Sequence, residues 1–187
     1  MTSSEFSFAI EIDRIPSAGG HYEVAAPPAA CAAIARRLDV LEVKALKGSF
    51  DVRMGAGGIV RVTGKVHAEL VQACVVSLAP VPARIDEEIE ATFVAAERLG
   101  RKKHKDAEEE EIVGLESEDP PEVSEDGRID LAELAITQVA LVLDPYPRAP
   151  GVAFDPAKAG LKASDIAAPE PTGPFAALAK LKKTQPI

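Results

Sequence analysis

The sequence has few cysteines, few aromatic residues and no long hydrophobic run. Its two cysteines, Cys31 and Cys74, cannot form the dense disulfide framework of a small secreted domain, and neither lies in a C-x-x-C pair. Reduced thiols in a cytoplasmic protein are therefore expected. No stretch approaches the roughly 18 uncharged apolar residues of a membrane-spanning helix, and the first residues lack the features of a secretory signal. Aromatic residues make up 4% with no Trp, so a core must be built from aliphatic side chains.

The chain has 187 residues, 47% of them hydrophobic, which suits one domain with a sizeable core. Lys and Arg number 21 against 30 Asp and Glu, a formal charge of −9. An evenly acidic surface would argue against a polyanionic partner, because phosphate contacts need cations. The charge is uneven, however. Residues 106–126 carry eleven acidic residues and no Lys or Arg, which leaves +2 for everything else. The net charge therefore does not exclude a role linked to RNA.

Apolar and polar residues alternate along several segments, which predicts strands. Strands are expected at 6–13, 21–24, 50–54, 60–70 and 85–93, and helices at 29–38 and about 131–143. The clearest pair is a hairpin, because glycines in Gly55–Gly58 separate two alternating runs. Glu87 falls on the apolar side of the last strand, so we expect it near a strand end where it reaches water.

The second helix has strong boundary signals. Asp130 is a good N-cap, Glu133 three residues later is a capping-box partner, and Asp144–Pro147 ends the helix. Because the helix is apolar on most sides, we expect the sheet to cover it. The predicted fold is α+β: a curved antiparallel sheet or partial β-barrel packed against a mostly buried helix at about 131–143.

The chain divides into a domain and a tail. Residues 1–150 are predicted to form the single α+β domain, interrupted at about 97–127 by a mobile, disordered acidic insertion of low hydrophobicity. Residues 151–187 are predicted to be a flexible tail rich in Pro and Ala. This tail ends in a short basic amphipathic segment.

Catalytic and metal-binding patterns are weak. Gly58 to Gly64 has the wrong spacing for a P-loop, and Val66 stands where Ser or Thr would bind magnesium. The histidines form no close ligand pairs, so no metal is expected. His67 and Cys74 imitate a nucleophile and base, but seven residues along an unbroken strand put them on opposite faces. We therefore expect no enzyme, no cofactor and no small-molecule substrate.

Clusters of cations are the better candidates for binding RNA or a partner. One cluster precedes the acidic run, and it either binds phosphates or pairs with Glu108–Glu111. The sequence alone favours pairing with these glutamates. The other lies in the C-terminal ridge, where docking on a partner and docking on its own domain are about equally plausible. The candidate residues, with two from the helix exit, are Arg98, Arg101, Lys102, Lys103, Lys105, Tyr146, Arg148, Phe175, Leu178, Lys180, Leu181, Lys182 and Lys183.

Four segments carry a family resemblance. They are Cys74–Pro80, the strand at 85–93, the helix and its exit from Ile129 to Pro147, and Pro174–Leu181. These segments resemble four features of the YceD family, the large ribosomal RNA subunit accumulation proteins. In the same order, the features are a Cys-x-x-Cys-Leu-x-Pro segment, the strand that follows it, a helix that begins with "I-D-L", and a closing Pro-Phe-x-x-Leu-x-x-Leu motif. Asp144–Arg148 is similar to the alphaproteobacterial version of the exit.

The chain also departs from this family. Ser77 stands at the second family cysteine, and no cysteine follows Cys74. If these thiols bind metal in other members, the resemblance implies that this chain has lost that site.

The resemblance implies a bacterial, cytoplasmic, non-enzymatic factor for the synthesis, processing or accumulation of 23S ribosomal RNA. Such a factor acts by binding either pre-ribosomal RNA or a ribosomal protein. The alternative is an adaptor whose acidic segment mimics RNA and binds a basic ribosomal protein. Neither hypothesis involves a membrane.

Overall fold

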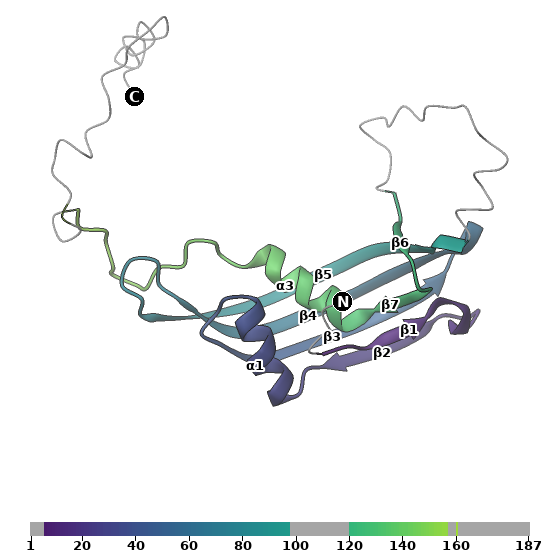
Figure 1. The fold of residues 1–187 in the computed structure, drawn as a ribbon, viewed down its shortest axis with the longest axis horizontal. Coiled ribbons are helices and arrows are strands. Elements are labelled where there is room, and N and C mark those ends of the chain that lie inside the picture. The colour runs from purple at the N-terminus through teal and green to yellow at the C-terminus, as the bar shows by residue number, and fades with distance from the viewer. Residues whose placement is uncertain (1–5, 98–119, 157–159, 161–187) are drawn as a thin grey trace, which may run out of the picture. The chain divides into compact units, whose positions relative to one another are not determined.

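The computed structural model describes residues 6–97, 120–156 and 160, and its main feature is an open, curved five-stranded sheet (Figure 1). The strand order is β2 (Gly20–Ala25), β3 (Glu42–Met54), β4 (Ile59–Ala73), β5 (Pro80–Ala95) and β6 (Glu122–Ser124). The first four strands are antiparallel, and β6 runs parallel to β5. The predicted α+β fold is confirmed in its open form, since the sheet does not close into a barrel.

Alternation along β4 separates a dry face of the sheet from a wet one. Val60, Val62 and Val66 are buried on the inner face, whereas Arg61 and Lys65 are exposed on the outer face. The predicted hairpin of β3 and β4 is confirmed, and its turn contains the short 3-10 helix η2 (Ala56–Gly58). The outer face of the sheet is consequently polar, and the helices that the structure describes pack on the inner face.

Two helices and a small strand pair cover the inner face. α1 (Pro28–Arg37) packs on β3, and α3 (Leu131–Val142) packs across β3, β4 and β5. β1 (Ala9–Glu11) pairs with β7 (Arg128–Asp130) and is followed by the 3-10 helix η1 (Ile12–Arg14). The strand predicted at 6–13 is thus limited to three residues.

Asp130 caps α3 as predicted, because its Oδ1 accepts the N–H groups of Ala132 at 3.0 Å and Glu133 at 3.2 Å. The carboxylate of Glu133 does not turn back to the cap. It pairs with both terminal nitrogens of Arg37 on α1 and so ties the two helices together.

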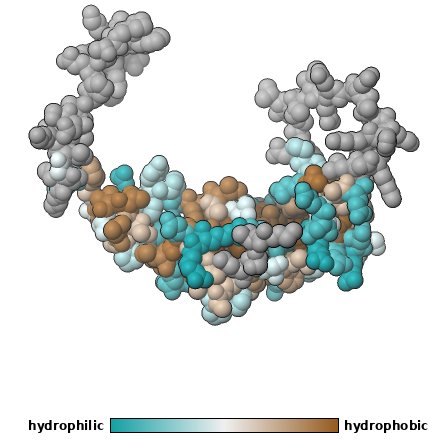
Figure 2. Space-filling model, viewed as in Figure 1, coloured by the Kyte–Doolittle hydropathy of each residue, from teal (hydrophilic) through white to brown (hydrophobic). Residues whose placement is uncertain are grey.

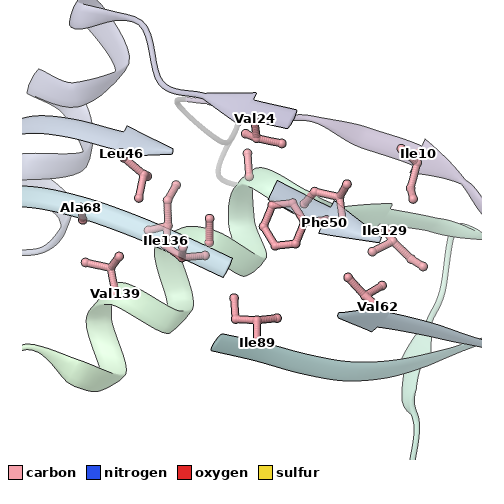
Figure 3. Close-up of a cluster of buried hydrophobic side chains, with 14 of the residues drawn as sticks. Ile10, Val24, Leu46, Phe50, Val62, Ala68, Ile89, Ile129, Ile136 and Val139 are labelled. Carbon is pink, nitrogen blue, oxygen red and sulfur yellow. The ribbon is translucent and has the colours of Figure 1, made fainter. Parts of the chain in front are cut away.

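Phe50 lies at the centre of the core, between the sheet and α3 (Figure 3). Its ring occupies the space above Gly48, two residues earlier on β3, and Gly64, which pairs with Phe50 across β3 and β4. A Cβ on Gly64 would overlap the carbonyl oxygen of Ser49 and lie 2.7 Å from Cδ1 of Phe50. These glycines therefore make room for the aromatic ring.

The predicted insertion ends earlier than expected. Residues 120–127 are part of the described structure, and they include β6, which pairs with Phe93–Ala95. Ser124 is buried and donates to the carbonyl oxygen of Arg128 at 2.8 Å, which fixes the chain as it turns toward β7. Low hydrophobicity and charge predict an insertion to about 127, but the last eight of these residues are held by β6 and the turn that follows it. Residues 98–119 lie outside the described residues, as does nearly all of the predicted tail, 151–187.

β5 also begins earlier than predicted, at Pro80, and Glu87 lies in its middle. Glu87 is half-exposed there, at a part of β5 that pairs only with β4 among the residues that the structure describes. Within the described residues no helix has the length and hydropathy to cross a membrane.

Candidate protein-interaction surface

Two segments that are far apart in the sequence meet at one end of the sheet. They are the β4–β5 loop, residues 74–79, and the exit from α3, residues 143–150. Val75 donates its N–H to the carbonyl oxygen of Pro147 at 2.9 Å, and the side-chain amide of Gln72 donates to the carbonyl oxygen of Asp144 at 2.8 Å. These bonds hold the loop against the helix exit, so their side chains form one surface.

Large hydrophobic side chains are exposed at this end of the molecule, where Figure 2 shows hydrophobic residues gathered. We call this surface the apolar end. Its residues are Val75 and Leu78 in the loop, Tyr146 in the helix exit, and Leu141 and Val142 in the last turn of α3. Leu78 and Leu141 are each 76% exposed, and Tyr146 is 71% exposed. Contiguous apolar surface rimmed by polar residues is typical of a protein-binding site.

The apolar end is also nearly free of charge. Residues 70–83 contain no charged side chain, and residues 134–150 contain only Asp144 and Arg148. Depletion of charge at the centre of an exposed patch is characteristic of protein interfaces. A site that grips phosphates needs cations instead.

Leu78 has a backbone conformation that leucine rarely adopts. Its φ of +60° lies in the left-handed region, which costs a non-glycine residue about 1–2 kcal/mol. Two hydrogen bonds hold the loop in this shape. The N–H of Leu78 donates to the carbonyl oxygen of Cys74 at 2.9 Å, and the N–H of Cys74 donates to the carbonyl oxygen of Ala79 at 2.8 Å. A strained leucine that is held exposed is more typical of a binding residue than of a packing residue.

The sulfur of Cys74 stabilises the loop from inside. It is fully buried and accepts the N–H of Ala149 at 3.3 Å and that of Ser77 at 3.4 Å. Hydrogen bonding to the Ser77 side chain, then to these two N–H groups, lowers the pKa of Cys74 from its usual value near 9 to about 6. The same hydrogen bonds favour the thiolate form of Cys74 and join the loop to the helix exit.

This thiolate predicts a dependence of stability on pH. Because the pKa of Cys74 is lower in the folded protein than in the unfolded chain, ionisation of this thiol stabilises the fold. The stabilisation is complete above the pKa of the unfolded chain and is lost as the pH falls through about 6. We expect the urea midpoint of the wild-type protein to rise from pH 6 to pH 9 by more than that of a Cys74→Ala variant. Parallel midpoints for the two proteins across this range would contradict the prediction.

The other candidate chemistry finds no support. His67 lies on the outer face, where its Nδ1 is 2.6 Å from Asp86, whereas the sulfur of Cys74 is bonded to Ser77 and Ala149. The two groups thus have separate partners and do not act as base and nucleophile. Among the residues that the structure describes, no three His, Cys, Asp or Glu side chains group in a way that would hold a metal ion.

Of the predicted binding residues, the structure describes two, Tyr146 and Arg148, and both are exposed beside the β4–β5 loop. The remaining eleven, in 98–105 and 175–183, lie outside the described residues and stay predictions. Sequence reasoning missed Leu78 and Leu141. The available signal was the absence of charge in 70–83 and 134–143.

Comparison with known proteins agrees with the four segments. The sequence model of the family described as large ribosomal RNA subunit accumulation protein YceD matches residues 62–182. No curated protein and no solved structure matches the chain. The match includes the β4–β5 loop, β5, α3 and the helix exit, so it contains both segments that form the apolar end. The chain belongs to the YceD family of large ribosomal RNA subunit accumulation proteins.

Proposed function

We propose that this protein supports the accumulation of 23S ribosomal RNA in the bacterial cytoplasm as a non-enzymatic assembly factor, and that it acts by binding a protein of the assembling large subunit. The observation that carries this proposal is the apolar end, because the family match contains both of the segments that build it.

The charge of the described residues favours a protein as the first partner. These residues carry 11 Lys and Arg against 19 Asp and Glu, a formal charge of −8. Such a domain repels phosphate groups at long range, so most cations for RNA would have to come from 98–105, 158–162 and 180–183. A basic ribosomal protein is attracted by the same charge.

Deleting the gene tests the proposed function. We expect the ratio of 23S to 16S ribosomal RNA to fall in the deletion strain and to return when a plasmid supplies the wild-type chain. Total RNA resolved by electrophoresis gives the ratio directly. A ratio that stays at the wild-type value in the deletion strain would rule out the proposed function.

A further inference from the structure

β5 has a long free edge. It pairs with β4 along its whole length, but within the described part of the chain its other side pairs only at Phe93–Ala95, with β6. From the described residues, no other backbone hydrogen bond reaches 80–92 on that side. An unpaired edge of this length is a template for a further strand.

The direction of the backbone groups along this edge follows from two observations. The carbonyl oxygen of Val71 accepts from Leu41 on the β3 side of β4, so the neighbouring Leu70 and Gln72 direct their groups toward β5. Leu70 pairs with Ala83 and Gln72 pairs with Val81, so these odd-numbered residues of β5 direct their N–H and C=O groups toward β4. Successive residues of a strand alternate in this direction, so the even-numbered residues of β5 direct their N–H and C=O groups to the free edge. Pro80 and Pro82 agree with this, since proline is tolerated where the N–H would face outward.

The side chains along the edge are acidic. Asp86, Glu88 and Glu90 alternate on the outer face, and Glu87 is half-buried on the inner face. Lys65 and Arg61 on β4 pair with Glu88 at 3.1 Å and with Glu90 at 2.6 Å. These pairs are exposed, with the Glu88 side chain 81% accessible, so the carboxylates remain open to cations from the edge side.

Asp86 keeps its charge at neutral pH. The guanidinium of Arg84, whose Nε is 2.7 Å away, and then the ring of His67 hold the pKa of Asp86 below its usual range. From residue 84 to residue 92 the strand carries four carboxylates and one cation. Arg84, with Lys65 and Arg61 on β4, offsets three of these four charges, so the unpaired edge keeps a net negative charge.

We infer that the edge of β5 binds an extended basic peptide as a sixth strand, with Lys or Arg at alternate positions opposite Asp86, Glu88 and Glu90. This rests on the proposed function and deepens it, because proteins that bind ribosomal RNA must carry such cations. Backbone hydrogen bonds supply the affinity in this mode of recognition, and the alternating charges supply the selectivity.

A synthetic probe tests this inference. It is an eight-residue peptide with lysine at alternate positions and valine or threonine between them, titrated into the ¹⁵N-labelled full chain. We expect amide shifts at Arg84, Asp86, Glu88 and Glu90, together with slower hydrogen exchange there. A peptide with glutamate in place of lysine should bind at least about tenfold more weakly, as should one N-methylated at the amides that face β5.

A Glu88→Pro variant separates the backbone from the charge. Proline at 88 removes an edge-facing N–H and leaves the β4 ladder intact, as Pro80 and Pro82 do in the native strand. We expect Glu88→Pro to fold and to lose at least about tenfold in peptide affinity, and Glu88→Gln to lose only about threefold. If Glu88→Pro does not fold, the N-methylated peptide still decides the matter.

Several results would overturn the inference. The N-methylated peptide could bind as tightly as the unmodified one, or the amide shifts could be confined to other surfaces. The edge amides could already be protected from exchange in the free chain, or the chain could form dimers through this edge. Because these measurements use the isolated protein, they are independent of the 23S ratio. An edge that binds no peptide, in a protein whose deletion lowers the ratio, removes the inference and leaves the proposed function.

Discussion

A Gly64→Val variant is expected to lose about 3 kcal/mol of folding free energy, a large share of the roughly 5–15 kcal/mol that stabilises a native domain. A Cβ at this position would overlap the carbonyl oxygen of Ser49 and lie 2.7 Å from the ring of Phe50. Neither group can retreat, since the first belongs to the backbone of β3 and the second is fully buried. Strand propensity alone predicts the opposite sign, because valine favours strands and glycine weakens them.

Urea unfolding followed by circular dichroism measures this effect. The matched control is Gly57→Ala in the β3–β4 turn. Its φ is +69° and nothing lies within 4 Å of the added Cβ, so it carries only the left-handed penalty of about 1 kcal/mol. A Gly64→Val protein with a midpoint at or above that of Gly57→Ala would show that Phe50 does not need this gap.

Local patterns were sufficient to predict most of the sheet. The alternation of apolar and polar residues predicts β4 and the side chains of its inner face, and Asp130 predicts the start of α3. Both signals can be interpreted because they depend only on neighbours in the sequence. Gly64 could not be interpreted this way. Its role depends on Phe50, fourteen positions away, whose ring crosses the hairpin only once the register of β3 and β4 is set.

The apolar end was harder to predict for the same reason. Leu78 and Tyr146 belong to different segments, and the bonds of Cys74 to Ala149 and of Val75 to Pro147 unite them. An uncharged run such as 70–83 has the same composition whether it is buried or exposed. Glu87 shows the converse, since its position on the apolar side predicts a strand end, whereas it lies in the middle of β5, at the part that lacks a second strand partner among the described residues.

A chain that carries Leu78→Asn together with Tyr146→Ser is expected to lose most of its ability to restore the 23S to 16S ratio in the deletion strain. Both side chains are more than two-thirds exposed, so the fold loses little when they change. Asparagine tolerates the left-handed conformation at position 78 better than leucine does, so that change relieves strain. Central residues of an interface are each worth about 2 kcal/mol or more, roughly a thirtyfold loss of affinity.

The matched control for this variant is Val123→Asn. Val123 is an exposed hydrophobic residue like Leu78, but it lies on β6 beside Val94, at the opposite end of β5 from the β4–β5 loop. We expect Val123→Asn to restore the ratio fully at equal protein levels, measured by immunoblot. If the double variant restores it equally well, the apolar end does not bind the partner. If Val123→Asn fails as completely as the double variant, the loss follows from any exposed apolar residue and does not locate the binding surface. Loss confined to the double variant would place the partner on the surface that Cys74 holds together.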